Sequence, residues 1–487
     1  MNSTARIFRL SFLLLISAAL MGCRSGPALI EQSPVIDRSI VEYPPNVQLT
    51  EYADGLTGPS AIAFDYDEGD HKGTMVIAES GRGGHSPRLY GFTPDGRFFD
   101  IYPRGKLPHL PSLPFDIGRG PFDFDPPIGG IVISGGRIFV THRDRNGRGV
   151  LTSFGYDGSH TTVVSDLPAQ GEFGVTDVAV RPSDGRIFFG LGSMTNSGVV
   201  GLDDWAIGWV QKHPEACDLP ATNLKLYGYR FDTKNPLAGL FGPDETAVTA
   251  PFQPFNISNR VRISKAVNDK PTGAIYSVSP GGGDLRVEAT GLRYPRGLAF
   301  DAYSLYFTDD GMEMRGTRPV KDDPDSLLKW VPGTYYGFPD FSTDLYPISD
   351  RRFQPPVWMI IKSGYPELSP VISLGDSDLV SPAPARESLL RATFPSLSGA
   401  ARFDIVPSDG PFREMRGNAV IALGGDRSPF ATSGVALKEP VGCKVVRCDP
   451  DQSNGTVSDF VYNTRGLPAH LLGRRERDIA MERPVDA

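Results

Sequence analysis

Residues 291–341 read GLRYPRGLAFDAYSLYFTDDGMEMRGTRPVKDDPDSLLKWVPGTYYGFPDF and contain one complete unit of a repeat. Short apolar strands are expected at Leu298–Phe300, Leu305–Phe307 and Leu328–Val331. The loop between the second and third strands carries five charged side chains close to two glycines, namely Asp309, Asp310, Glu313, Arg315 and Arg318. Two strands, a charged loop and a third strand are typical of one blade of a β-propeller, and loops at one face of a scaffold commonly carry its site.

Degraded copies of this unit recur along the chain. The expected innermost strands begin at 61–65, 131–134, 177–182, 298–300, 402–407 and 483–487. Asp-Gly, Gly-Gly and Pro-Gly turns follow many of the later strands and supply the positive φ that hairpins need. The pattern predicts an all-β chain folded as a six-bladed propeller of four-stranded antiparallel blades, with the last blade incomplete. Residues 194–273 fit no repeat and are interpreted as an irregular insertion without its own core.

The composition agrees with many short strands. The 487 residues include 55 glycines and 44 prolines, without a collagen-like period. The formal net charge is -8, and no stripe of basic and aromatic residues is present. An acidic chain of this kind is a poor partner for nucleic acid.

The N-terminus has the pattern of an export signal. Arg6 and Arg9 precede the apolar run Leu10–Leu20, which as a helix would span only about 16 Å of a bilayer core of about 30 Å. We therefore predict a signal peptide over residues 1–22 rather than a membrane-spanning helix. The sequence Leu20-Met21-Gly22-Cys23 resembles a bacterial lipobox, which implies lipidation at Cys23 and a membrane contact through that anchor alone. Plain secretion is the alternative.

The residue after this cysteine, Arg24, favours the outer membrane, at its periplasmic face, over the inner membrane. Residues 23–48 contain proline, serine and glycine without periodicity and predict a flexible tether. The propeller is then expected to occupy residues 49–487.

Four further motifs accompany GLRYPRGLAFD, DDGMEMRGTRP and YYGFPDF. They are GRIFFGLGSMTNSGVVG at 185–201, ALGGDRSP at 422–429, GCKVVRCDP and the terminal ERPVDA. Together these motifs resemble the glucose/sorbosone dehydrogenase family. They cover about residues 50–487 in the family's order, and the L-sorbosone-dehydrogenase-like branch is the most similar. The resemblance implies a dehydrogenase dependent on pyrroloquinoline quinone (PQQ) on a six-bladed propeller. Family members usually continue beyond the ERPVDA motif, which again implies an incomplete last blade.

The resemblance also implies where the cofactor's three carboxylates are held. It places guanidinium contact at Arg293 and further cationic contacts at Lys444 and Arg447, since cations pair with carboxylates and the arginine fork binds both oxygens. Lys444 and Arg447 lie three residues apart in an expected strand. They therefore point to opposite faces, and a regular strand would bring only one of them to a central ligand.

Calcium is the second cofactor that the resemblance implies. Main-chain carbonyls of Gly311 and Met312, beside Asp310, match the family's calcium ligands. Arg315 and Arg318 in the same loop would help to hold the quinone. The alternative is a solvated loop whose charges pair with one another.

The histidine base of the family is missing. Its position aligns with Phe173, and the nearest ionisable residues are Glu172 and Asp177, either of which can act as a base if burial raises its pKa. The family's aspartate after the next strand is replaced by Ser193. His142 ends an expected strand and is interpreted as a surface residue, although a position in the central channel would make it a base.

Other candidate ligand contacts have structural alternatives. Asn196, in the retained Thr195–Gly198 segment, can hydrogen-bond a ligand or form a turn. Tyr335, Tyr336 and Phe338 can stack on a flat quinone or sugar, or fill the space between blades.

Two main hypotheses follow. The first is an exported, lipid-anchored dehydrogenase that oxidises a sugar or polyol with PQQ and calcium and passes electrons to a respiratory acceptor. The second is a catalytically inactive propeller lipoprotein that binds a carbohydrate or a protein partner. A calcium-dependent lactone hydrolase on the same architecture is a third class, but its signature is absent from this sequence.

Overall fold

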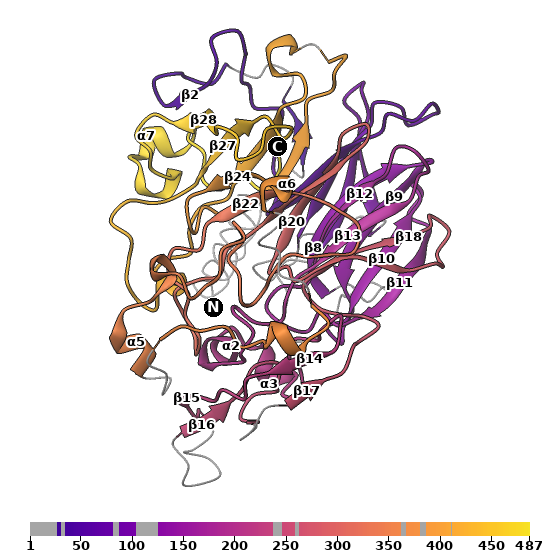
Figure 1. Ribbon diagram of the computed structural model, residues 1–487. Helices are drawn as coiled ribbons and strands as arrows, with labels where there is room; N and C mark the ends of the chain where they lie inside the picture. The colour runs from indigo at the N-terminus through magenta and orange to yellow at the C-terminus, as the bar shows by residue number, and fades with distance from the viewer. Residues whose placement is uncertain are drawn as a thin grey trace, which may run out of the picture.

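The computed structural model describes residues 27–30, 35–80, 87–103, 125–236, 246–258, 263–361, 367–379, 386–410 and 412–487. Most of its regular structure is β (Figure 1). Five sheets have four or five strands, and three small sheets have two. The all-β prediction is confirmed.

Each large sheet is an antiparallel meander that starts with its innermost strand. Blade one comprises β4 (Pro59–Phe64), β5 (Met75–Glu79), β6 (Arg88–Phe92) and β7 (Phe98–Tyr102). Blade two comprises β8 (Asp125–Ser134), β9 (Arg137–Arg143), β10 (Gly149–Phe154) and β11 (His160–Leu167). Blade three comprises β12 (Val175–Val180), β13 (Ile187–Leu191), β18 (Ala274–Val278) and β19 (Arg286–Thr290), with β23 (Thr334–Tyr335) added in parallel.

Blades four and five continue the pattern. Blade four comprises β20 (Pro295–Phe300), β21 (Leu305–Asp309), β22 (Asp325–Lys329) and β24 (Leu390–Phe394). Blade five comprises β25 (Ala400–Ile405), β26 (Ala419–Leu423), β27 (Lys444–Cys448) and β28 (Ser458–Asn463). The expected unit at 291–341 is confirmed, because β20 and β21 precede the charged loop and β22 follows it, as predicted.

Side chains of the first or second strand of one blade reach the innermost strand of the next blade. The Thr141 hydroxyl donates to the carbonyl of Thr176, and the Thr176 hydroxyl donates to the carbonyl of Pro295. Thr308 donates to the carbonyl of Ala401 at 2.9 Å. At Gly297 an added Cβ would lie 2.5 Å from that same carbonyl oxygen, so the approach of β20 to β25 requires glycine. These contacts run around a common axis, as in a propeller.

The described residues form five blades, whereas the sequence predicted six. Residues 483–487 were expected to begin the sixth blade but form no strand. They lie between β25 and β4, where the Asp486 carboxylate accepts from the backbone N–H of Ile62 at 2.9 Å. Arg402 donates to the carbonyls of Ser60 and Val485. Side chains, rather than a ladder of backbone hydrogen bonds, join these five residues to the neighbouring blades.

The described part of the expected tether is packed on the propeller. β1 (Ala28–Leu29) pairs with β3 (Ala53–Asp54), and β2 (Val41–Glu42) adds to the outer strand of blade five. Val41 and Tyr43 are buried against β28. The signal peptide and Cys23 lie outside the described residues. No helix in the described ranges is long and apolar enough to span a bilayer.

The insertion after β13 contains structure of its own. It includes the helices α2 (Leu202–Ile207) and α3 (Trp209–Lys212) and the strands β14 (Leu224–Leu226), β15 (Phe231–Lys234), β16 (Thr246–Thr249) and β17 (Ile263–Lys265). Figure 1 shows these elements with α5 (Val357–Ile361) at the end of the molecule opposite β2 and β28. The remaining short helices are α6 (Arg386–Leu389) and α7 (Arg474–Arg477).

One expectation about this insertion was wrong. The insertion separates β13 from β18, which is the third strand of blade three. Leu224, Leu226 and Phe252 form a small apolar core with Val371 and Ile372, so the insertion has a core that its composition did not indicate. This core depends on residues more than 100 positions away, which a local pattern does not reveal.

Candidate functional site

The candidate site is a cluster of charged side chains on loops at one end of the blades. In each meander the first strand begins, and the second strand ends, at the same edge of the sheet. Loops before β12 and β20 supply Glu172 and Arg293, and loops after β13, β21 and β26 supply Asn196, Arg315 and Arg427. Because these loops lie at the same edge of each sheet, side chains from blades three, four and five meet there.

Arg315 lies at the centre of the cluster, with its side chain 2% exposed. Its Nη1 contacts the Asp203 carboxylate at 2.6 Å, and its Nη2 contacts the Glu172 carboxylate at 2.6 Å. Its Nε donates to Glu313. All three nitrogens of this guanidinium are therefore engaged by carboxylates.

Arg427 closes the solvent side of the cluster. Its Nη2 donates to Glu313 at 2.6 Å and to Glu172 at 3.1 Å. Within the described ranges no acceptor meets its Nε or Nη1, and its side chain is 43% exposed. Phe430 lies beside it and stacks over Arg315 at 4.9 Å. The cluster thus reaches solvent through one guanidinium with unused donors.

Arg293 is held from two sides. Its Nη2 donates to the side-chain oxygen of Asn196 at 2.9 Å, and its Nε donates to the carbonyl of the same residue at 3.1 Å. Its guanidinium lies 4.4 Å from the ring centre of Phe173. Asn196 also donates to the carbonyl of Glu313 at 2.9 Å, so it ties Arg293 to the charged loop.

Arg318 is enclosed elsewhere in the loop. Its Nη2 donates to the Asp340 carboxylate at 2.8 Å, and both side chains are 1% exposed. Its donors also meet the carbonyls of Ser197, Pro339 and Ser369. This ion pair joins the charged loop to two other segments and has no opening to solvent.

Asp310 carries an unusual free oxygen. Its Oδ2 accepts from Arg296 at 3.1 Å, whereas its Oδ1 is buried and meets no hydrogen-bond donor in the described part of the chain. Burial raises the pKa of Asp310, and the charges of Arg296, Arg293 and Arg427 oppose that rise. Like Arg427, Arg296 keeps unused donors, because only its Nη1 makes a hydrogen bond to a described residue.

Two neighbouring carboxyl groups have strongly shifted pKa values. Burial raises the pKa of Asp309 to about 7, against hydrogen bonds from the backbone N–H groups of Tyr294 and Arg293. Burial also raises the pKa of Asp325 to about 7, and the charge of Asp310 adds to the rise. Asp325 accepts from Gly311, Ser398 and Ala400, so it joins the charged loop to blade five.

The pKa values of the carboxyl groups around Arg315 are shifted in opposite directions. Burial would raise the pKa of Glu313, but Arg315, Arg427 and Arg293 outweigh it and hold that pKa well below its usual range. Burial raises the pKa of Asp203 despite Arg315, and it raises the pKa of the adjacent Asp204 further, because Asp203 and Glu172 add their charges. Glu313 therefore stays ionised at neutral pH.

The structure brings most of the predicted site residues together but not all of them. Glu172, Asn196, Arg293 and Arg315 meet in the cluster, with Glu313. Asp310 and its neighbours Gly311 and Met312 adjoin it, because Arg293 donates to the carbonyl of Asp310 at 3.4 Å. In the charged loop, the backbone N–H of Gly311 donates to the Asp325 carboxylate, and the backbone N–H of Met312 donates to the Asp323 carboxylate.

The other predicted residues lie in different surroundings. Asp177 is buried, accepts from Leu298 at 3.0 Å and pairs with Arg402 at 3.1 Å, so it joins blades three, four and five. Lys444 pairs with Asp459 at 2.6 Å on the neighbouring strand, and Arg447 lies in the same ladder. Tyr336 donates to the carbonyl of Lys329 at 2.7 Å and packs edge-on against Phe307.

The interpretation of His142 as a surface residue was wrong. The side chain is buried, and burial lowers its pKa to about 4. Its Nε2 lies 2.8 Å from the hydroxyl of Thr152 in the adjacent strand. This histidine is neutral at physiological pH and contacts its own blade.

Sequence reasoning missed three members of the site. Arg427 stands in the ALGGDRSP motif but was given no role, and Arg296 stands in RYPRG with the same omission. The motifs were the signal that would have identified both. Asp203 gave no such signal, because its position in an irregular insertion does not indicate that it faces Arg315.

The polar groups of the site fit both an anionic cofactor and a calcium ion. The residues that would hold them differ in part from those predicted. Arg293, Arg315 and Arg318 have carboxylate or carbonyl partners, so an anionic cofactor would meet the unused N–H groups of Arg296 and Arg427. The free Oδ1 of Asp310 suits a hard cation. The described residues contain no group of three or more acidic, histidine or cysteine side chains placed to hold a metal. Calcium would therefore depend on main-chain oxygens beside Asp310.

Comparisons with known proteins find distant likeness only. No protein-family model and no curated protein matches the chain. A putative oxidoreductase (glucose dehydrogenase) from Thermus thermophilus is 16% identical, with 83% of this chain and 84% of that chain covered and a TM-score of 0.40. The PQQ domain of pyranose dehydrogenase from Coprinopsis cinerea, in its holo form, is 14% identical, with coverage of 95% and 93% and a TM-score of 0.44.

A third solved structure is a carbohydrate-active enzyme of family AA12 from Trichoderma reesei. It is 13% identical, with coverage of 90% and 88% and a TM-score of 0.44. At these identities and scores, no activity or residue role is transferred to this chain.

Proposed function

We propose that the protein is an oxidoreductase that uses PQQ and calcium to oxidise a sugar or polyol at the charged cluster. The observation that carries this proposal is the combination at one face of two guanidinium groups with unused donors, Arg296 and Arg427, and the buried free oxygen of Asp310. Such a combination suits a ligand that carries several carboxylates together with a cation. The motif resemblance described above points to the same class of cofactor.

Each residue has a definite task in this proposal. Arg296 and Arg427 bind the cofactor's carboxylates, and Asp310, with the main-chain oxygens of Gly311 and Met312, holds calcium. The bound quinone supplies the hydride acceptor. Arg293 and Asn196 position the charged loop.

Glu172 is the carboxylate placed to accept a proton from the substrate hydroxyl. Its two oxygens contact Arg315 and Arg427, so neither oxygen is open to a substrate hydroxyl unless ligand binding draws Arg427 away. Its activity as a base therefore depends on that movement.

Titration with PQQ and Ca²⁺, followed by thermal unfolding, tests this proposal. A ligand that binds only the native state raises the melting temperature with its concentration. We expect a calcium-dependent rise with PQQ, and reduction of an artificial electron acceptor when sugars are added. Arg427→Gln should remove the response to PQQ while the chain stays folded. Absence of any rise at saturating PQQ in folded wild-type protein would refute the cofactor assignment.

A second function, binding without catalysis, is favoured by one specific observation. Phe173 takes the position expected for a histidine base and stacks under Arg293, while Arg315 and its carboxylates satisfy one another. A carbohydrate or protein partner would then bind at the same face. Sugar-dependent stabilisation without dye reduction would favour this function.

The proposed location is the periplasmic face of a bacterial membrane, with the outer membrane favoured. The lipobox-like sequence ending in Cys23 and the following Arg24 support this proposal. Metabolic labelling with a fatty acid, compared between wild type and Cys23→Ser, tests the anchor. A respiratory component is the proposed electron acceptor.

A further inference from the structure

One aromatic ring at the charged cluster remains exposed to solvent. Phe430 begins the short 3₁₀ helix Phe430–Thr432, and its side chain is 39% exposed. The guanidinium of Arg315 lies 4.9 Å from the centre of its ring, and that of Arg427 lies 5.8 Å away. Phe173, which stacks with Arg293 in the same cluster, is by contrast buried. Phe430 therefore offers ring surface to a ligand that occupies the cluster.

The backbone around Phe430 holds its ring in a fixed position. The two residues that follow it are buried. The backbone N–H of Gly434 donates to the carbonyl of Pro429 at 2.7 Å, and the hydroxyl of Ser433 donates to the carbonyl of Met314, in the charged loop, at 3.0 Å. A ring that is already held loses little conformational entropy when a ligand covers it, so binding there is less costly.

The groups beside the ring suit a ligand with an apolar face and a polar edge. Nε and Nη1 of Arg427 meet no acceptor in the described ranges, so N–H donors stand next to the ring. The face of an aromatic ring is electron-rich and attracts the hydrogens of C–H groups. A pyranose with equatorial hydroxyl groups carries its C–H groups on its two faces and its hydroxyl oxygens around its edge. An open-chain polyol has no such continuous C–H face.

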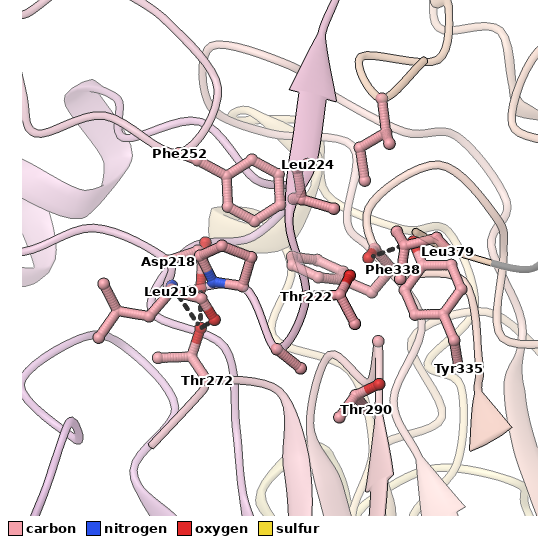
Figure 2. Close-up of a pocket in the computed structure, with 14 residues that line it drawn as sticks. Asp218, Leu219, Thr222, Leu224, Phe252, Thr272, Thr290, Tyr335, Phe338 and Leu379 are labelled. Carbon is pink, nitrogen blue, oxygen red and sulfur yellow. Dashed lines mark hydrogen bonds between the residues drawn. The ribbon is translucent and has the colours of Figure 1, made fainter. Parts of the chain in front are cut away.

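A hollow between the insertion and blade three does not provide a second place for a sugar. Figure 2 shows its lining, with Asp218 and Phe252 on one side and Tyr335 on the other. It has room for only about 30 Å³ of water-sized molecules. A sugar ring does not fit into this space, whereas the exposed ring of Phe430 sets no such limit.

We infer that Phe430 binds the substrate by stacking against one face of a pyranose ring, whose hydroxyl oxygens accept hydrogen bonds from Arg427. The inference rests on the proposed function, which places a sugar or polyol at the cluster, and it narrows that class to a cyclic sugar. Phe430 has no part in holding the cofactor. Its role is specificity for ring-closed over open-chain substrates.

Saturation-transfer NMR with methyl β-D-glucopyranoside and the full chain tests the inference. The probe cannot open its ring, and D-glucitol is the open-chain comparison. Both are titrated with and without PQQ and Ca²⁺. We expect saturable binding of the pyranoside to wild type and much weaker binding of glucitol.

Three variants test the contribution of the aromatic ring. Phe430→Ala and Phe430→Leu should each weaken binding of the pyranoside about threefold to tenfold, because leucine restores apolar bulk but not a ring face. Phe430→Trp should retain binding, which a merely structural role of Phe430 would not predict. Phe412→Ala is the matched control. Phe412 is 48% exposed and follows β25 at the opposite edge of blade five, so this variant should bind as wild type does.

No saturable binding of the pyranoside to folded wild type, equal binding of glucitol, or unchanged affinity in Phe430→Ala would each overturn the inference. Circular dichroism establishes that each variant is folded, and Phe430→Leu decides the outcome if Phe430→Ala is not. The rise in melting temperature with PQQ and Ca²⁺ should persist in Phe430→Ala, which separates this inference from the cofactor assignment. If wild type shows no such rise but its pyranoside binding depends on Phe430, the oxidoreductase proposal fails and the stacking role of Phe430 stands.

Discussion

Arg315 and Arg318 leave the same loop three residues apart, yet they reach opposite kinds of surroundings. Within the described residues Arg318 meets the carboxylate of Asp340 and several backbone carbonyls, and each side chain of the pair is 1% exposed. Arg315 meets three carboxylates, two of which also bind the exposed Arg427. Arg318 is enclosed, whereas Arg315 is separated from solvent only by Arg427.

The difference separates structural from functional charge. A buried ion pair that also hydrogen-bonds backbone groups of other segments holds those segments in place, and removing one partner leaves a charge without compensation. A cluster in which guanidinium and carboxylate groups share partners can exchange one of them for a ligand. Four experiments, in order of decreasing effect, test this contrast.

Asp340→Ala should have the largest effect. It leaves Arg318 buried without its carboxylate and removes the acceptor for the N–H groups of Val371 and Ile372. We expect a loss of about 3–5 kcal/mol in the free energy of unfolding, measured with urea. Asp409→Ala, at an exposed site, is the control and should change stability by less than about 0.5 kcal/mol. A loss below about 1 kcal/mol at Asp340 would contradict the structural assignment.

Arg315→Met should cost about 3 kcal/mol at pH 7.5 and less at pH 4.5. Arg315 is one of three guanidinium groups that, against burial, lower the pKa of Glu313. A lowered pKa contributes stability above the unfolded pKa of about 4.3, and that stability is lost as the pH falls through the folded pKa. Without Arg315, Glu313 gains its proton at a higher pH, so the variant recovers part of its deficit in acid.

Urea unfolding at the two pH values measures this difference. Arg97→Met removes an exposed ion pair with Asp95 and serves as the control, with an expected change below about 1 kcal/mol at both pH values. A deficit of Arg315→Met that grew towards pH 4.5 would show that the carboxylates do not depend on this guanidinium.

Asp310→Asn should remove the response to calcium. Wild type should gain about 2.7 kcal/mol at a calcium concentration 100 times the dissociation constant. The other proposed ligands are neutral main-chain oxygens, so asparagine would leave the site without a negative charge to attract a divalent cation. Thermal unfolding with Ca²⁺ and with Mg²⁺ measures the effect, with Asp409→Asn as the matched control. The same gain in Asp310→Asn and wild type would place calcium elsewhere.

Arg427→Gln should have the smallest effect on stability, less than about 1 kcal/mol, because the side chain is 43% exposed and Arg315 still pairs with both of its carboxylate partners. It should nevertheless abolish the rise in melting temperature that PQQ causes. Arg475→Gln, on the exposed surface of α7, controls for the loss of one positive charge. A stability loss as large as that of Asp340→Ala would mean that Arg427 is part of the scaffold.

The blades could be read from the sequence because their signals are local. Apolar runs and turn glycines predicted β20, β21 and β22 and the charged loop between β21 and β22. The count of six blades was wrong because residues 483–487 resemble a strand start but form no ladder. The expected tether was wrong for residues 35–48, since Val41 and Tyr43 look unremarkable until β28 lies against them.

The candidate site was predicted only in part. The motifs identified Asn196 and Arg293, and the position of the missing histidine pointed to Glu172. All three meet Arg315 or its neighbours. Arg427 stands in a motif but was given no role, and Asp203 stands in an irregular insertion that does not indicate its contact with Arg315. Asp177 lies close to Glu172 in the sequence, but it joins three blades instead.

The sequence by itself determined that this chain forms antiparallel blades and that residues 309–318 carry a concentration of charge. Period, turn chemistry and composition act over a few residues, so they survive without tertiary context. Only the tertiary structure decided which of those charged side chains stabilise the fold and which are available to a ligand. Arg318 meets Asp340, and Arg315 shares its partners with a residue open to solvent, because charge pairing depends on distance in space and not on spacing along the chain.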